Sequence, residues 1–434
     1  MKFIDILTDR DLDAAIRDIT HPPRESADAQ RQTEALEATR AIVEDVRQRG
    51  AEAVAEYTER FDGVRLAPDA FEVTSKEVDE AMEQVSPELI SALERAHENI
   101  EAFHRKSIAQ SWEERDADGT VMGQRVTPIE SAGVYVPGGK AFYPSSVLMN
   151  IVPARAAGVR DIVMASPPSW EGTIHPLVLA AARIAGATRI FRVGGAQSVA
   201  ALAYGAGPIP PVVKITGPGN IYVSLAKRLV SDVCAIDKEA GPSEVLVIAD
   251  GSAEPRLAAA EMLAQAEHEE DAVPMLIATS REYAEKVMIA VESELLHLSR
   301  AVIALRALEN QGRAYIVRSL DEAVTLANAL APEHMALQTA EPEALFARIQ
   351  NVGCTVLGAG TPVALGDYFA GPNHILPTGR RARFASPLTA ADFCKVTNYF
   401  AYAPERLEHA ANDVINLATA EELTAHARSV EVRR

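Results

Sequence analysis

The sequence is poor in cysteine and in positive charge. Its 434 residues include only three cysteines, an odd number without C-x-x-C spacing, so we expect neither a disulfide framework nor a thiolate zinc site. Lys and Arg number 42 against 61 Asp and Glu, and the net charge of -19 disfavours binding to nucleic acid or to an anionic membrane. No apolar run approaches the length of a membrane span, and the N-terminus lacks the apolar core of a secretory signal. We therefore expect a cytoplasmic protein.

Short β-rich runs alternate with Ala-rich helical stretches from about residue 126 onward, after a first part that is mostly helical. Such alternation is typical of parallel sheets covered by helices, and a chain of this length exceeds the size at which one core stops growing. We expect one α/β unit up to Cys234, a second after Gly241 and a helical tail beyond Pro387, with ligands at the carboxyl ends of the strands. The predicted strands are 133–136, 161–165, 189–193, 212–215, 245–249, 274–279, 314–317, 335–337 and 354–357.

Three glycine-rich turns follow predicted strands of the first α/β unit. They are residues 135–140 (YVPGGK), 194–197 (GGAQ) and 217–220 (GPGN). Glycine lets the backbone approach a ligand closely, and the N–H groups of the helix that follows can bind an anion. The three turns together therefore favour a nucleotide or phosphate site over ordinary tight turns. The chain has no G-x-G-x-x-G and no P-loop motif, so neither of those fingerprints supports the hypothesis.

Two segments contain side chains that could bind a metal ion. Gln265 and His268 end a predicted helix, and residues three apart lie on one face of a helix. Gln is an uncommon metal ligand, so a solvated helix end is the simpler interpretation of this pair alone. Asp367, in the segment GDY, could add a carboxylate oxygen, and the glycines near it indicate a backbone crowded against another group.

A possible acid/base pair lies at Glu333 and His334, where a carboxylate and an imidazole follow a helix-ending proline. A surface turn is an equally good interpretation of that segment. In the tail, Glu422 and His426 are four residues apart and follow Glu421, and pairing on a solvated helix face is the better interpretation there. A binding protein without activity would have no need of an acid/base pair, so Glu333 and His334 favour an enzyme.

Taken together, these segments resemble the histidinol dehydrogenase family. The resemblance spans nearly the whole chain and rests on YVPGG, GGAQSVAALAYG, GPGN, AGPSEVLVIAD, QAEH, APEH, GDYFAGPNHILPT, RFASPL and ELTAH, in the family's order and at comparable spacing. It implies an α/β fold with two Rossmann-like parallel-sheet domains and a small helical tail domain, in a domain-exchanged homodimer. The implied parts are an N-terminal segment packing with the tail (1–29), a discontinuous first α/β domain (30–134 and 243–388), a second, NAD-binding α/β domain (135–242) and a tail reaching the partner subunit (389–434).

The resemblance also implies the site residues, position by position. The implied ligands of one zinc ion per subunit are Gln265, His268, Asp367 and His426, with the tail that carries His426 donated by the partner. The implied substrate contacts are the zinc ligands with Ser243, His334, His374 and Glu421. The implied NAD contacts are Tyr135, Gln197 and Asn220, one from each glycine-rich turn.

The implied reaction converts L-histidinol, two NAD and water into L-histidine and two NADH through an enzyme-held histidinal. His334 would take the alcohol proton, Glu333 would activate the water that adds to the aldehyde, and zinc would orient the substrate. Arg380 and Arg381 stand where many family members have less charged residues. We interpret them as surface charge. The alternative is a paralogous zinc- and NAD-dependent dehydrogenase that binds another small polar alcohol, such as a sulfonated propanediol.

Overall fold

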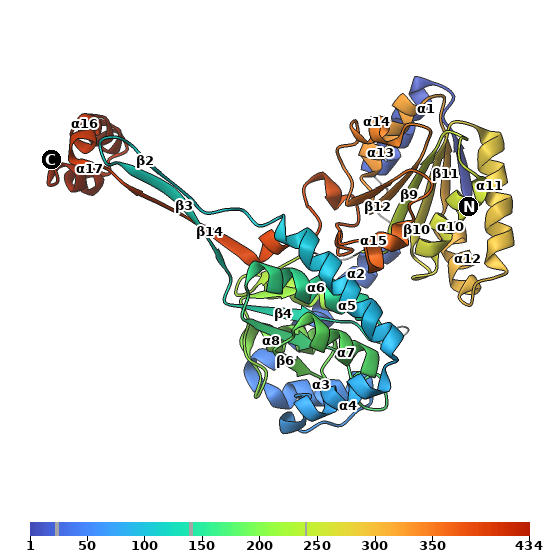
Figure 1. Ribbon diagram of the computed structural model, residues 1–434, viewed down its shortest axis with the longest axis horizontal. Helices are drawn as coiled ribbons and strands as arrows, with labels where there is room; N and C mark the ends of the chain where they lie inside the picture. The colour runs from blue at the N-terminus through green and yellow to red at the C-terminus, as the bar shows by residue number, and fades with distance from the viewer. Residues whose placement is uncertain (22–25, 139–141, 239–240) are drawn as a thin grey trace.

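The computed structural model describes the whole chain except residues 22–25, 139–141 and 239–240 (Figure 1). For residues 26–31 it describes the backbone but not the side chains. The molecule has a body that contains two parallel sheets, and an arm that projects from the body and ends at the C-terminus (Figure 1). Within the described part of the chain, every helix is too short or too polar to cross a lipid bilayer.

The six-stranded sheet has the order β1-β11-β10-β9-β12-β13, and all of its strand pairs are parallel. Its strands are β1 (Lys2–Asp5), β9 (Glu244–Ala249), β10 (Val273–Ala278), β11 (Arg313–Ile316), β12 (His334–Gln338) and β13 (Cys354–Leu357). The helices of this unit are α1 (Asp9–Thr20), α10 (Pro255–Ala266), α11 (Arg281–Leu295), α12 (Ala301–Asn310), α13 (Leu320–Leu330), α14 (Pro342–Phe346) and α15 (Val363–Tyr368).

Strand β9 lies between two buried apolar clusters, one on each face of the sheet. Val245 and Val247 lie in one buried cluster with α10, α11 and α12. Leu246 and Ile248 lie in the cluster on the opposite face, with α1 and α13. Because helices cover both faces, all side chains from Val245 to Ala249 are apolar rather than every second one, and only Glu244 at the start of the strand is polar.

The five-stranded sheet has the order β6-β5-β4-β7-β8 and is also parallel. Its strands are β4 (Ser131–Tyr135), β5 (Asp161–Ala165), β6 (Arg189–Phe191), β7 (Lys214–Thr216) and β8 (Ala235–Ile236). Its helices are α2 (Ser26–Arg49), α3 (Ala51–Asp62), α4 (Ser75–Gln84), α5 (Pro87–Arg105), α6 (Pro144–Ala157), α7 (Pro176–Ala185), α8 (Gly195–Tyr204) and α9 (Ile221–Leu229). Ile162 and Met164 of β5 face α5, α6 and α7, whereas Val163 and Ala165 face α2, α3 and α8.

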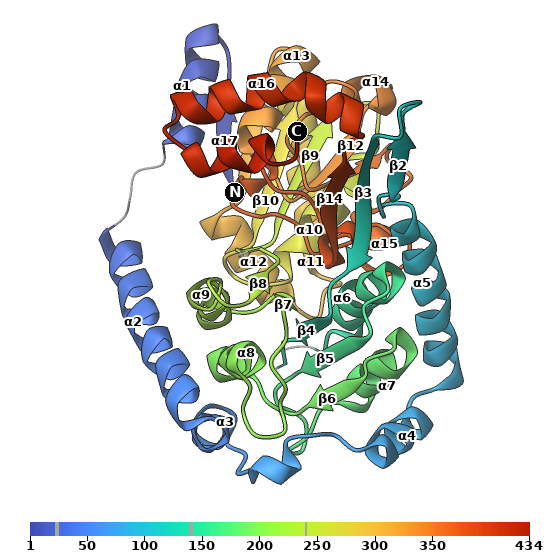
Figure 2. The ribbon, with the colours of Figure 1, turned by 90° about the vertical axis from the view of Figure 1, so that its left-hand side faces the viewer.

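The structure corrects the predicted division of the chain. Residues 30–134 were assigned with 243–388, but α2 and α3 pack on α8, and α4 and α5 pack on α7 and α6 (Figure 2). Their apolar faces, such as Val46 of α2 and Ile100 of α5, are buried in the cores of the five-stranded sheet. The six-stranded sheet instead takes its edge strand β1 from the N-terminus, and α1 packs on α13. Within one chain this N-terminal segment lies away from the tail (Figure 1).

The predicted helical tail is confirmed by α16 (Pro404–Ala420) and α17 (Thr424–Glu431), and a strand that was not predicted precedes these helices. The tail begins with β14 (Cys394–Ala401), which pairs antiparallel with β3 (Val121–Pro128), and β3 pairs with β2 (Trp112–Arg115). These strands form the arm, and α16 and α17 lie at its far end (Figure 1). Most side chains of β14 are exposed on both faces, so the strand lacks the alternation of buried apolar positions that would have predicted it.

His104 gives the body a measurable sensitivity to acid. Its ring on α5 is fully buried, neither ring nitrogen has a hydrogen-bond partner, and burial lowers its pKa from 6.5 to about 4. His104 therefore binds a proton below pH 6.5 in the unfolded chain but only below about pH 4 in the folded chain. The free energy of unfolding consequently falls as the pH falls between these values. The loss amounts to at most about 3 kcal/mol.

We expect His104→Leu to flatten this acid dependence. Urea unfolding at pH 7 and at pH 4.5, at one protein concentration, measures it. The wild-type protein should lose about 2 kcal/mol more than the variant between the two pH values. Equal losses in the two proteins would show that His104 does not remain neutral in the fold.

Candidate active site

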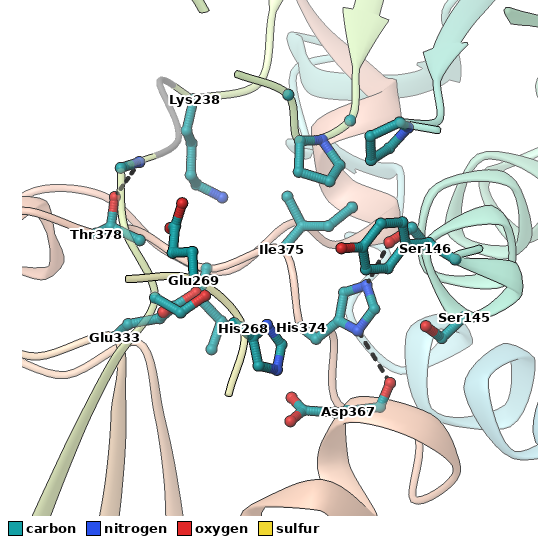
Figure 3. Close-up of a pocket in the computed structure, with 18 of the residues that line it drawn as sticks. Ser145, Ser146, Lys238, His268, Glu269, Glu333, Asp367, His374, Ile375 and Thr378 are labelled. Atoms are coloured by element: carbon teal, nitrogen blue, oxygen red, sulfur yellow. Dashed lines mark hydrogen bonds between the residues drawn. The ribbon is translucent and has the colours of Figure 1, made fainter. Parts of the chain in front are cut away.

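A cavity of about 450 Å³ lies where the two sheets face each other (Figure 3). The segments that follow β4, β7 and β8 form its wall on the side of the five-stranded sheet, together with the start of α6. The other wall comes from the segments that precede β9 and β12, and from the ends of α10 and α15. The cavity thus lies at the carboxyl end of one sheet, as predicted, but at the amino end of the other.

This arrangement gives the two walls opposite polarity. Helices α6 and α9 begin at the cavity, so the positive ends of their dipoles face it from one side. Helix α10 ends at the cavity, so free carbonyl groups and the negative end of a dipole face it from the other. The first wall suits an anion such as a phosphate, and the second suits a cation.

The cavity brings together eight of the predicted site residues. They are Ser243, Gln265, His268, Glu333, His334, Asp367, His374 and Asn220. Figure 3 shows the side chains of His268, Asp367 and Glu333 directed into the same space, although they come from three different elements. Helix α10 supplies Gln265 at its last turn and His268 just beyond its end, so the predicted spacing does place both at one cavity wall.

Burial controls the charge of the catalytic candidates. It lowers the pKa of His334 to about 3 and that of His374 to about 4, so both imidazoles are neutral at pH 7 and able to accept a proton or bind a metal. Burial raises the pKa of Asp367 to about 7 and that of Glu333 well above its usual range. The Nε2 atom of His334 lies 3.6 Å from Asp367 Oδ1 and 4.0 Å from Glu333 Oε1, so two carboxyl groups lie beside that nitrogen.

Glu244, which the sequence analysis overlooked, holds Glu333 in place. The backbone N–H of Glu244 donates to Glu333 Oε2 over 2.9 Å, and the backbone N–H of Glu333 donates to Glu244 Oε2 over 3.2 Å. The other carboxylate oxygen of Glu244 accepts from Gly379 over 2.8 Å. These bonds join the starts of the neighbouring strands β9 and β12. Only its position beside Ser243 could have drawn attention to Glu244.

The donors present in the cavity fit a zinc ion in part. Gln265, His268 and Asp367 offer an amide oxygen, a neutral imidazole and a carboxylate, which are acceptable zinc ligands and leave one of four positions for a further donor. Among the described residues, no three His, Cys, Asp or Glu side chains form a metal cluster within one chain. His426 lies on α17 and Glu421 at the end of α16, both exposed at the far end of the arm (Figure 1).

Tyr135 connects the three glycine-rich turns. Its hydroxyl accepts a hydrogen bond from the Gly195 N–H over 3.4 Å. A Cβ on Gly217, whose φ is +117°, would lie 2.0 Å from the Tyr135 carbonyl oxygen, so only glycine fits there. Asn220 caps α9 by accepting from the N–H groups of Tyr222 and Val223. The Gly139 and Lys140 of the first turn lie outside the described residues.

The side chain of Gln197 indicates that a polar ligand binds near these turns. It lies on α8, is 1% exposed, and neither of its side-chain amide atoms has a hydrogen-bond partner. A buried amide without a partner costs free energy, which a ligand that offers donors and acceptors would recover. Neither Gln197 nor Tyr135 lines the cavity itself, so they would contact a ligand that extends beyond it.

Arg380 has a structural role rather than a place in the site. Its guanidinium donates to the carbonyl oxygens of Ile19 over 2.8 Å and Ala329 over 3.1 Å, which ties the segment after Pro377 to the ends of α1 and α13. Arg380 and Arg381 are both described, and neither lines the cavity. The alternative of an anionic substrate held by these arginines therefore gains no support.

The chain was compared with known proteins. A family model described as histidinol dehydrogenase matches residues 25–434. The histidinol dehydrogenase of Heliobacterium mobile is 50% identical over 392 residues, which is 90% of this chain and 92% of that protein. That of Geobacter sulfurreducens is 50% identical over 395 residues, 90% of this chain and 91% of that protein. A crystal structure of histidinol dehydrogenase from Elizabethkingia anophelis matches with a TM-score of 0.92 at 34% identity, covering 100% of this chain and 98% of that one. The chain belongs to the histidinol dehydrogenase family.

Proposed function

We propose that the protein oxidises L-histidinol to L-histidine in two NAD-dependent steps, through L-histidinal held in the cavity. The observation that carries the proposal is the buried pair Glu333 and His334, which faces metal donors on the cation-binding wall and lies across from the glycine-rich turns. Membership of the family supports the same substrate. Such a site has a base, an orienting group and a place for a dinucleotide, which together suit hydride transfer from an alcohol.

His334 acts first. As a neutral imidazole it accepts the hydroxyl proton of histidinol while the carbinol carbon gives its hydride to the first NAD, which leaves the aldehyde. Asp367 and Glu333 stabilise the imidazolium from 3.6 Å and 4.0 Å. Because the cavity is enclosed by both sheets, the reactive amino aldehyde stays bound until the second step.

Glu333 acts in the second step. It removes a proton from the water that adds to the aldehyde, and the resulting diol loses its second hydride to a second NAD with His334 again as the base. The bond from the Glu244 N–H fixes one carboxylate oxygen of Glu333 and leaves the other directed toward His334. One carboxylic acid and two NADH are therefore formed from one alcohol, two NAD and one water.

The remaining predicted residues bind and orient. The proposed zinc ligands are Gln265, His268 and Asp367 with His426 of the partner subunit. When bound there, zinc supplies a fixed template for the nitrogen atoms of the substrate. Proposed substrate contacts are Ser243, His374 and Glu421 of the partner subunit, and proposed NAD contacts are Tyr135, Gln197 and Asn220. The Ser146 hydroxyl and His374 Nε2 lie 3.3 Å apart, which holds that imidazole at the cavity.

A homodimer with exchanged tails would complete the site. The arm projects from the body and carries exposed apolar side chains, among them Phe400 at 74% and Leu417 at 67% exposure. Apolar surface on a projecting arm is typical of a surface that another subunit covers. His426 and Glu421, which are too far from the cavity of their own chain in Figure 1, would then reach the cavity of the partner.

Two variants with complementary defects test this exchange. Asp367→Asn damages the pocket and His426→Asn damages the tail, so each pure dimer is expected to lose its zinc and nearly all activity. In a mixed dimer with exchanged tails, one of the two sites combines an intact pocket with an intact tail. Co-expression with random assembly should therefore restore about a quarter of wild-type activity and zinc. If the tail served its own subunit, no mixed dimer would contain an intact site and co-expression would restore nothing.

Substrate choice is tested with the two alcohols side by side. Purified protein with excess NAD should form NADH from L-histidinol at least 100-fold more efficiently than from 2,3-dihydroxypropane-1-sulfonate, because the groups proposed to hold the substrate lie on the wall that suits a cation, whereas the lysine of the cavity, Lys238, lies on the opposite wall. The product of the first reaction, identified by mass, should be L-histidine. A preference for the sulfonate would refute this proposal and support the alternative, a paralogous dehydrogenase of another small alcohol.

A further inference from the structure

Lys238 carries a buried ammonium group that has no described hydrogen-bond or ion-pair partner. Its side chain projects into the cavity (Figure 3), and its Nζ atom is buried without a hydrogen-bond partner. Burial lowers the pKa of Lys238, and the carboxylates of Asp392 and Asp237 offset this only in part. Neither of them lies within ion-pair distance of the ammonium. A buried ammonium without a partner costs several kcal/mol. A ligand that brings negative charge to this point would recover that cost.

The backbone of Lys238 is fixed beside the third glycine-rich turn. Strands β7 and β8 are parallel neighbours with Ile215 opposite Ile236, so two residues further on Gly217 and Lys238 stand side by side. The Nζ atom of Lys227 binds both of their carbonyl oxygens, over 2.9 Å to Gly217 and 2.8 Å to Lys238. The lysine therefore belongs to the cavity wall that carries the helix N-termini, not to the wall that carries His268.

We propose that Lys238 binds a phosphate of the dinucleotide. The positive end of the α9 dipole and the ammonium of Lys238 lie at one cavity wall, and both favour an anion. The ammonium is the described donor still free there, because the N–H groups of Tyr222 and Val223 are bonded to Asn220 and that of Gly217 to Asp237. The proposal rests on the proposed use of NAD, and it adds a charged contact to the three NAD contacts inferred above. The carboxylate of the product is the other anion available, but the groups proposed to hold the substrate lie on the opposite wall.

The test measures the binding of NADH to the free protein by fluorescence. This binding assay needs no substrate. Lys238→Met should lower the affinity for NADH about tenfold. It should lower the affinity for ADP-ribose, which keeps the pyrophosphate, by a similar factor. Adenosine, which has no phosphate, should compete equally well for both proteins. Lys238→Arg should restore most of the binding. Arg228→Met, on the exposed face of α9, removes the same charge nearby and should change the NADH affinity less than twofold.

A second readout separates binding from a structural role. Because Lys238→Met removes an unpartnered buried charge, the variant without ligand should melt at a higher temperature than the wild type, and NADH should raise its melting temperature less. Unchanged NADH affinity, or a higher KM for histidinol with the same NADH affinity, would overturn the proposal. The protein could also bind NADH through Lys238 without oxidising histidinol. That result would support the proposed role of Lys238 and refute the proposed substrate.

Discussion

Glu333→Gln is expected to stop the reaction after its first oxidation. The amide oxygen of glutamine can still accept from the Glu244 N–H, so the side chain keeps its place, but it cannot take a proton from water. In single-turnover experiments with excess NAD, the first NADH should form at close to the wild-type rate. The second should form about 10²–10⁴ times more slowly, which is the usual contribution of a general base.

The matched control is Glu343→Gln on the exposed side of α14, which should leave both phases unchanged. Zinc content should equal that of the wild type in both variants, because Glu333 is not a proposed ligand. If Glu333→Gln formed both NADH molecules at wild-type rates with zinc bound, the role assigned to Glu333 would be wrong.

Lys227→Met is expected to give the largest loss of stability. The Nζ atom of Lys227 donates to Asp237 Oδ1 over 2.5 Å, and both side chains are only 1% exposed. Asp237 also accepts from the Gly217 N–H over 2.8 Å. Removing the lysine leaves a buried carboxylate without its ion-pair partner, which should lower the free energy of unfolding by about 3–5 kcal/mol.

Two further variants separate charge from packing. Lys227→Met combined with Asp237→Asn removes both charges and keeps an acceptor for Gly217, so it should recover at least half of the loss. Lys286→Met breaks an exposed pair with Glu282 and should cost less than about 1 kcal/mol. Urea unfolding at one protein concentration measures all three. A loss below 1 kcal/mol for Lys227→Met alone would show that the pair does not hold this end of the sheet together.

The sequence predicted best the parts of the fold that are buried on both faces. Strand 161–165 was predicted with the bounds that the structure shows, because its side chains from Ile162 to Ala165 are buried between two helical layers. Strand 354–357 also has the predicted bounds, although it lies at the edge of its sheet and is only half-buried. The arm was not predicted, since its β14 is exposed and pairs with a strand more than 260 residues earlier in the chain. The helices before residue 110 were assigned to the wrong sheet because an apolar helix face does not show which core will bury it.

The site was predictable to the extent that single residues have recognisable chemistry. The Glu333–His334 pair and the residues at the end of α10 could be found in the sequence, and both line the cavity. The residues that position them could not. Glu244 and Glu333 are 89 positions apart, and Lys227 of α9 meets Asp237 only once β8 has paired with β7. Such contacts come from the register of the sheets, which no local pattern shows.

The most direct test of the proposed function is the amount of NADH formed for each L-histidinol consumed, measured at the end point with excess NAD. We expect two NADH for each histidinol, with L-histidine as the product and no free aldehyde trapped by an added hydrazine. One NADH for each histidinol, with aldehyde released into solution, would contradict it. That result would mean that the cavity performs a single alcohol oxidation and that Glu333 activates no water.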